Sequence, residues 1–114
     1  MPYINLKLSV PVSEAQKEKI QNEIADAAVS DLSKPKQYVM VGIENSADLW
    51  FAGKKLDKGA FVSVSLYGRA SPSATGNMTS SVCKILENEL GIPGNCIYVA
   101  YYPLDNWGWN GSNF

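Results

Sequence analysis

The sequence has no histidine, which removes the commonest general base and the commonest metal ligand of proteins. Every Ser-His or Cys-His catalytic arrangement is thereby excluded. The two cysteines, Cys83 and Cys96, are too far apart for a Cys-x-x-Cys pair and too few for a zinc site. We therefore predict no metal and no cofactor, and we interpret both cysteines as small buried hydrophobic residues. Enzyme chemistry would have to use carboxylates, lysine, tyrosine or the amino terminus.

Net charge and long apolar runs are also scarce. A net charge of −1 over 114 residues offers no basic footprint for nucleic acid. Lys54, Lys55 and Lys58 form one small basic patch, which we interpret as a solvated loop. No apolar run is long enough to span a bilayer, and no signal peptide is visible. We expect one domain over residues 1–114, without nucleic-acid or membrane partners, in the cytoplasm; export without a signal peptide is the alternative.

The first half of the chain has the pattern of a strand, a helix and a second strand. Residues 3–10 alternate between apolar and polar positions, which is typical of a half-buried strand. Ser13, with Gln16 three residues later, predicts a capping box at the start of a helix. Pro35 blocks continuation of that helix, and residues 38–43 predict the second strand. The apolar face of the predicted helix consists of Ile20, Ile24, Ala27, Ala28 and Leu32.

The second half of the chain repeats the first at a shift of 58 residues. Ser13 becomes Ser71, and Pro35 becomes Pro93. The matched apolar positions are Ile4 and Val62, Leu6 and Val64, Leu8 and Leu66, Ile20 and Met78, Ile24 and Val82, Leu32 and Leu90, Val39 and Ile97, and Val41 and Val99. Because this register needs no gap, we interpret the chain as two copies of one β-α-β unit, over residues 2–44 and 60–102.

Two such units side by side predict an α+β fold, a duplicated β-α-β unit with a four-stranded sheet and both helices on one face. The strands of each unit run parallel because a helix connects them. The other face of the sheet then has no cover within the chain. It would carry Tyr3, Tyr38, Met40, Phe61, Tyr98 and Tyr102. Since an aromatic patch of that size usually marks an interface, we expect a homo-oligomer.

Three features have a functional interpretation beside a structural one. Met1-Pro2 is a common start, but removal of Met1 would leave Pro2 as a free secondary amine, a ready proton acceptor. Lys34 lies near a helix C-terminus, where a cation is favourable in any case, yet its counterpart in the second copy is Ile92. The aromatic and glycine-rich tail, residues 106–114, fits an edge strand on a neighbour, a wall of an apolar pocket, or both.

Several short segments form a pattern with these features: Met1-Pro2, Lys34-Pro35, Tyr38-Val39-Met40-Val41, Tyr67-Gly68, Ile97-Tyr98-Val99 and Trp109-Asn110-Gly111-Ser112. Together they resemble the macrophage migration inhibitory factor family of the tautomerase superfamily, over the whole chain. The resemblance implies a homotrimer with its sheets turned inward. It also implies a keto–enol tautomerase acting on phenylpyruvate-like small aromatic 2-keto acids. The alternative is a cytokine-like secreted ligand of a receptor protein, with weak or vestigial tautomerase activity.

The resemblance also implies roles for individual residues. Pro2 is similar to the catalytic base, which takes the α-proton and returns it at the other end of the enol. Lys34 resembles the group that holds the substrate carboxylate, and Tyr67 stands where the family uses a backbone N–H for the same carboxylate. Tyr98 would come from the neighbouring subunit. The residues that would line the aromatic pocket are Tyr38, Trp107, Trp109 and Phe114.

The chain also departs from the family pattern. The family's Cys-x-x-Cys element would fall at residues 59–62, which contain no cysteine, and this argues against a thiol-redox role. Ala100 stands where the family has a pocket-rim asparagine, so a side-chain contact to a ring hydroxyl is lost. Tyr67 replaces a smaller aliphatic residue and would narrow the mouth. Arg69 is the single arginine, which argues against the hydration or decarboxylation chemistry of related proteins, because those reactions would need extra arginines.

Overall fold

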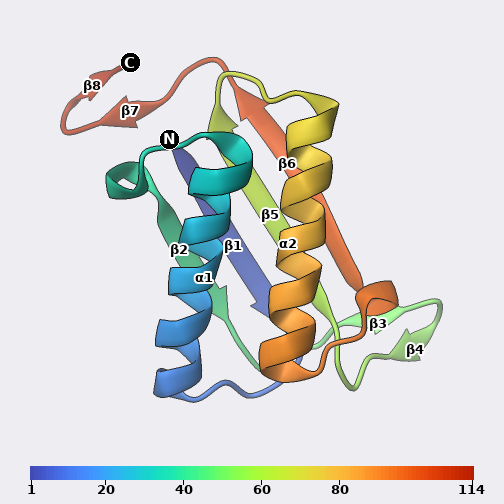
Figure 1. Ribbon diagram of the computed structural model, residues 1–114. Helices are drawn as coiled ribbons and strands as arrows, with labels where there is room; N and C mark the ends of the chain where they lie inside the picture. The colour runs from blue at the N-terminus through green and yellow to red at the C-terminus, as the bar shows by residue number, and fades with distance from the viewer.

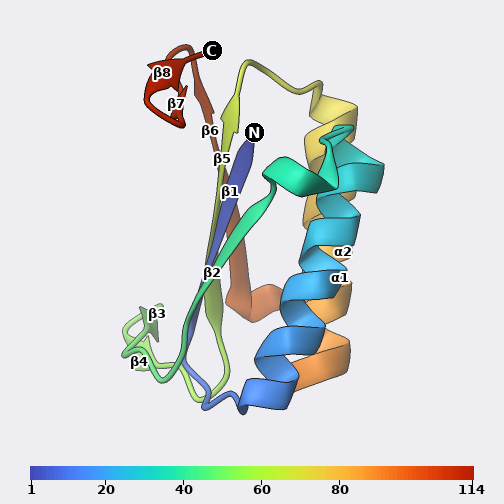
Figure 2. The same ribbon diagram turned by 90° about the vertical axis from the view of Figure 1, so that its left-hand side faces the viewer.

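The computed structural model describes residues 1–114 and has two layers, a mixed sheet and a pair of helices on one of its faces (Figures 1 and 2). The sheet has the strand order β2-β1-β5-β6. β1 runs parallel to β2, β5 runs parallel to β6, and β1 pairs antiparallel with β5. The main elements are β1 (Pro2–Leu8), α1 (Glu14–Leu32), β2 (Met40–Glu44), β5 (Ala60–Tyr67), α2 (Pro72–Leu90) and β6 (Ile97–Leu104). The predicted α+β fold with a duplicated β-α-β unit is confirmed.

Short elements extend the repeat beyond the two β-α-β units. Each copy has a 3₁₀ turn after its helix and a two-stranded hairpin after its second strand. These are η1 (Lys36–Tyr38), η2 (Gly94–Cys96), the hairpin of β3 (Trp50–Phe51) with β4 (Lys54–Lys55), and the hairpin of β7 (Gly108–Trp109) with β8 (Ser112–Asn113). Corresponding elements again start 58 residues apart, as at Lys36 and Gly94. The hairpins project from opposite ends of the sheet, on the side away from the helices (Figure 2).

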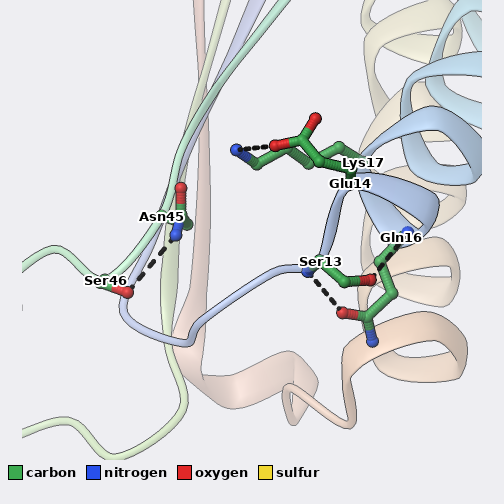
Figure 3. A network of polar contacts seen from close by, with 6 residues as sticks. All are labelled: Ser13, Glu14, Gln16, Lys17, Asn45 and Ser46. Atoms are coloured by element: carbon green, nitrogen blue, oxygen red, sulfur yellow. Dashed lines mark hydrogen bonds and ion pairs between the residues drawn. The ribbon is translucent and has the colours of Figure 1, made fainter.

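The helices begin where their capping residues predict. Ser13 Oγ accepts a hydrogen bond from the Gln16 N–H at 3.1 Å, and Gln16 Oε1 accepts one from the Ser13 N–H at 2.9 Å (Figure 3). In α2, Ser71 Oγ accepts a hydrogen bond from the Ala74 N–H at 3.1 Å without a reciprocal bond, and Pro72 stands in the first turn. Side-chain caps of this kind satisfy backbone donors that the helix itself leaves unpaired. Both predicted helix starts are therefore confirmed.

The core lies between the sheet and the helices. Its largest fully buried side chains are Ile4, Leu6, Leu8, Ile20, Ile24, Leu66, Met78, Leu86, Ile92, Val62, Val64 and Val82. Burying each such side chain stabilises the fold by about 1.5–3 kcal/mol relative to exposure. No helix is both long and apolar enough to cross a membrane. Cys83 and Cys96 pack against this core but are only half-buried, so the prediction that both are buried is confirmed only in part. The turn η2 holds Cys96 near the edge of the sheet.

Two strand boundaries differ from the prediction. β1 ends at Leu8 rather than at residue 10. The second strand begins at Met40, because the backbone N–H of Tyr38 donates to the carbonyl oxygen of Pro35 at 3.0 Å in the turn η1. Tyr38 is half-buried in that turn, so its placement on the open face of the sheet was also wrong. The aromatic and apolar side chains that do remain exposed on the sheet strands are Tyr3, Met40, Phe61, Tyr98, Tyr102 and Leu104.

Candidate active site

The first strand brings Pro2 into a pocket at one end of the sheet. Pro2 is buried, and it pairs with Leu66 in the antiparallel ladder between β1 and β5. The pocket has a volume of about 280 Å³ and is mainly apolar. It is lined by Met1, Pro2, Tyr3, Gln37, Tyr38, Val39, Met40, Trp107, Gly108 and Trp109. Four of the predicted site residues therefore meet here, from three separate parts of the chain.

The carboxyl-terminal hairpin closes one side of this pocket with aromatic rings. The Phe114 N–H donates to the carbonyl oxygen of Trp107 at 2.9 Å, which folds the tail back on itself. Tyr38 meets Trp109 edge-on, with ring centroids 5.6 Å apart, and Phe114 lies 6.3 Å from Trp109 in a stacked arrangement. Phe114 also lies 5.8 Å from Tyr67. Contacts of this kind fix ring positions beyond simple burial, so the tail forms an aromatic wall that Phe114 links to Tyr67.

Lys34 reaches the same end of the sheet from the end of α1. The helix stops at Ser33, which adopts a left-handed conformation with a φ of 55°. The Lys34 N–H then donates to the Ala28 carbonyl oxygen at 3.4 Å. Its side chain is half-buried, and Nζ donates to the carbonyl oxygen of Tyr67 at 3.4 Å. The sharp turn after α1 thus directs the lysine toward the start of β1.

The surroundings of the amino terminus lower the pKa of its α-amino group. Burial, and then the positive charge of Lys34, hold the pKa of the Met1 α-amino group below its ordinary value. Both effects disfavour the charged form of an amine. The Met1 carbonyl oxygen accepts a hydrogen bond from the Tyr67 N–H at 3.1 Å, so the first residue is tied to β5. Pro2 lies one residue further into the same environment.

Tyr98 lies away from this pocket within one chain. It pairs with Phe61 near the start of β5, whereas Pro2 pairs with Leu66 near the end of that strand. The ring of Tyr98 lies 5.2 Å from that of Phe51 on the β3–β4 hairpin, and 59% of the residue is exposed. Any role for Tyr98 at Pro2 therefore requires a second subunit.

Some pocket residues were missed by the sequence analysis. Gln37, Val39 and Met40 line the pocket because residues 36–38 form a turn, and Tyr3 lies beside Met40 in the parallel register of β1 and β2. The available signal was Pro35, which starts the turn. Alternation in the following residues favoured a strand instead, and this concealed the turn.

Comparison with known proteins agrees with this arrangement. The family model described as Macrophage migration inhibitory factor (MIF) matches residues 1–114. Macrophage migration inhibitory factor of Xenopus laevis is 30% identical over 115 residues, which cover 92% of this chain and 99% of that protein. The crystal structure of Leishmania major MIF2 has a TM-score of 0.94 at 30% identity, covering 100% of this chain and 97% of that one.

A second solved structure extends the similarity. The macrophage migration inhibitory factor homologue from Prochlorococcus marinus has a TM-score of 0.88 at 32% identity, with 98% of each chain covered. The whole-length family match, the shared fold and the similar lengths all agree. The chain therefore belongs to the macrophage migration inhibitory factor family, within the tautomerase superfamily.

Proposed function

We propose that this protein is a phenylpyruvate-type keto–enol tautomerase that uses Pro2 as its general base once Met1 has been removed. The observation that carries the proposal is the burial of Pro2 in a mainly apolar pocket close to Lys34. Burial and a nearby positive charge lower the pKa of an amine, so an amine in such a pocket becomes neutral at a lower pH than a solvated amine. A neutral amine with a pKa near the working pH is an effective general base.

The proposed reaction moves one proton within the substrate. The neutral Pro2 nitrogen takes a proton from the carbon next to the keto group, and the electron pair of that bond moves toward the keto oxygen. The resulting secondary ammonium then returns the proton to that oxygen, which gives the enol. The reverse sequence gives the keto acid, so no cofactor or net change in oxidation is needed.

Lys34 and Tyr67 would hold the substrate carboxylate. The Lys34 ammonium has three donors, of which one contacts the Tyr67 carbonyl oxygen. The backbone N–H of Tyr67 lies on the same residue and would supply a second donor once Met1 is gone. Tyr38, Trp107, Trp109 and Phe114 would enclose the aromatic ring, since the first three line the pocket and Phe114 packs on two of them.

We further propose that three chains form the working unit. The open sheet face exposes Tyr98 and Met40, with 59% and 66% of each residue accessible. Burial of such a face in a closed ring would remove its apolar surface from water. It would also let Tyr98 enter the pocket of a neighbour. Sedimentation should give a mass of about three chains, and a stable monomer at micromolar concentration would eliminate this role of Tyr98.

The experiment that tests the function compares two proteins whose first residues are verified by intact mass. The processed protein, which begins at Pro2, should tautomerise phenylpyruvate. A variant with Ala inserted between Met1 and Pro2 should be inactive yet keep its oligomeric state, because its Pro2 nitrogen is an amide. Pro2→Gly keeps an amine without the ring, so it should be slower but active.

Full activity of the insertion variant would show that Pro2 is not the base. The alternative function, a secreted receptor ligand with vestigial activity, predicts negligible turnover even in the fully processed protein. The same assay therefore separates the two functions.

A further inference from the structure

Met1 does more in this structure than acylate Pro2. Its carbonyl oxygen accepts the Tyr67 N–H at 3.1 Å, which extends the β1–β5 ladder by one residue beyond the pair of Pro2 and Leu66. The carbonyl oxygen of Tyr67 accepts Lys34 Nζ at 3.4 Å. In an antiparallel strand the N–H and carbonyl of one residue point to the same edge. The Met1 carbonyl therefore lies at the edge of β5 where Lys34 brings its positive charge.

We propose that Met1 is an internal blocker of the carboxylate site, with its backbone carbonyl bound to the donor that later receives the substrate carboxylate. This inference rests on the proposed function, in which Tyr67 N–H and Lys34 hold that carboxylate. Before processing, the chain is blocked twice. The Pro2 nitrogen is an amide without basicity, and the Tyr67 N–H already has an acceptor.

Processing removes both blocks in one step. A methionine aminopeptidase adds one water across the Met1–Pro2 peptide bond. Free methionine leaves with the former carbonyl carbon as its carboxylate, and Pro2 becomes a secondary amine. The Tyr67 N–H loses its acceptor at the same time. A carboxylate then binds there more strongly than a neutral carbonyl, because a charged acceptor makes a shorter and stronger hydrogen bond.

Pro2, Lys34 and Tyr67 are all at least partly shielded from water, which favours specific binding of a ligand beside them. Pro2 is buried, and Lys34 and Tyr67 are half-buried, so a ligand at this edge is partly removed from water. The Lys34 charge also lowers the pKa of the amine at Met1, which shows that its field reaches the chain start. A carboxylate bound at this edge of β5 would accept hydrogen bonds from the backbone N–H of Tyr67 and from the ammonium group of Lys34.

The test uses ligands that cannot react. 3-Phenylpropanoate has the carboxylate and ring but no keto group, and 3-phenylpropanamide is its neutral counterpart. Calorimetry would compare their binding to the processed protein and to the variant with Ala between Met1 and Pro2. Once its methionine is removed, that variant begins Ala-Pro and keeps a carbonyl in the place of the Met1 carbonyl. Circular dichroism and sedimentation would verify that both proteins have the same fold and assembly.

We expect 3-phenylpropanoate to bind the processed protein about tenfold or more tighter than the Ala-extended protein. The neutral amide should lose clearly less than the carboxylate on extension, because its carbonyl accepts a weaker hydrogen bond from the freed Tyr67 N–H. Lys34→Ala should weaken binding of the carboxylate to the processed protein and leave its binding to the extended protein almost unchanged. Equal loss of both ligands on extension would mean that the extra residue merely fills the pocket, and this would overturn the proposal. Equal binding of the carboxylate by both proteins would overturn it too.

Hydrogen exchange at one amide gives a second readout. The Tyr67 N–H should exchange slowly in the Ala-extended protein, faster in the processed protein, and slowly again when 3-phenylpropanoate is added. Unchanged exchange in all three states would overturn the proposal. A processed protein that shows these binding and exchange differences but no turnover would eliminate the proposed catalysis and leave the carboxylate site standing. Turnover without these binding and exchange differences would support the proposed catalysis and overturn the role of Met1 as a blocker of the carboxylate site.

Discussion

The two ends of the sheet are copies of one another, and only one of them holds Pro2, the proposed base. β1 begins at one end with η1 and the β7–β8 hairpin beside it. β5 begins at the opposite end, where a second pocket of about 580 Å³ lies between the β3–β4 hairpin and residues of the η2 region such as Pro93 and Cys96. The backbone of the two copies is closely matched. The Lys34 N–H meets the Ala28 carbonyl oxygen at 3.4 Å, and the Ile92 N–H meets that of Leu86 at 3.3 Å.

The difference between the two ends lies in side chains and in chain position. Ile92 is fully buried in the core, whereas its counterpart Lys34 turns toward Tyr67. Ala60 corresponds to Pro2, but its nitrogen lies inside the chain and is always an amide. Duplication can copy a pocket, but it cannot copy a chain terminus. The repeated backbone thus forms a pocket at each end, and the proposed base and its lysine stand at positions where the two copies differ.

The largest expected effect on stability comes from exchanging the side chains at Lys34 and Ile92, where the two copies of the repeat differ. Ile92→Lys would bury an ammonium without a partner, so we expect the free energy of unfolding to fall by about 4 kcal/mol or more. Urea denaturation would measure this. The reciprocal change, Lys34→Ile, is the control and should alter stability by only a few tenths of a kcal/mol, since the lysine contributes little more than its charge near a helix end. Equal losses in both variants would mean that the two positions are not distinguished by burial.

Removing the charge of Lys34, at the end of the sheet that holds Pro2, should weaken substrate binding more than it lowers stability. Lys34→Ala should lower kcat/KM for phenylpyruvate by about 10- to 100-fold, because a hydrogen bond to a charged group contributes about 1.5–3 kcal/mol. Thermal unfolding of the same variant should change little. An unchanged rate at low substrate concentration would remove Lys34 from the site.

The pH dependence of the tautomerase rate tests whether Lys34 lowers the pKa of the proposed Pro2 base. Burial and the charge of Lys34 lower the pKa of the Met1 α-amino group, and the proposed base is the neutral amine of Pro2 in the same environment. The rate should therefore rise with pH through one ionisation below the roughly 7.7–8.0 of a solvated α-amino group, then level off. In Lys34→Ala the inflection should move to higher pH, because one of the two lowering effects is lost. A fall in rate across this range, or an inflection that does not move, would contradict the assignment.

A smaller effect concerns the ring end of the substrate. Ala100 and its repeat counterpart Gly42 leave the open sheet face without a polar side chain at these positions. The kcat/KM values of phenylpyruvate and its para-hydroxylated analogue should then correspond to transition-state binding energies that differ by less than about 1 kcal/mol. Competition between the two substrates would measure this difference. A large preference for the hydroxylated acid would indicate another donor, and Tyr3, which lines the pocket, would be the first to substitute.

The smallest effect concerns the contact between the helices, where the copies differ again. At one end Ser81 Oγ donates to Asp31 Oδ2 at 2.6 Å. At the repeat-related end, Glu23 faces Glu89, and Glu23 Oε1 is buried without a partner. The proximity of Glu89, then burial, raises the pKa of Glu23 above its ordinary value.

Glu23→Gln should therefore stabilise the protein slightly at neutral pH, on the order of 2 °C in Tm. A carboxyl whose pKa is raised by folding costs stability only while it is ionised. The gain should thus disappear as the pH falls through the raised pKa. A gain that is independent of pH would point to packing rather than charge.

Much of this protein was already determined by the sequence alone. The repeat, the apolar faces, the capping residues around Ser13 and Ser71 and the exchange of Lys34 for Ile92 are local or periodic signals. Such signals follow from side-chain direction and backbone donors within one element. They were sufficient for the fold class and for the choice of Pro2 and Lys34 as candidates.

Only the tertiary structure decided which of these residues meet. The turn at residues 36–38 moved Tyr38 off the sheet face and brought Gln37 and Met40 into the pocket. The strand register separated Tyr98 from Pro2 and placed the Met1 carbonyl on Tyr67. These outcomes depend on contacts between segments far apart in the chain, which no local pattern encodes, because a shift of one residue in register changes every partner across the sheet.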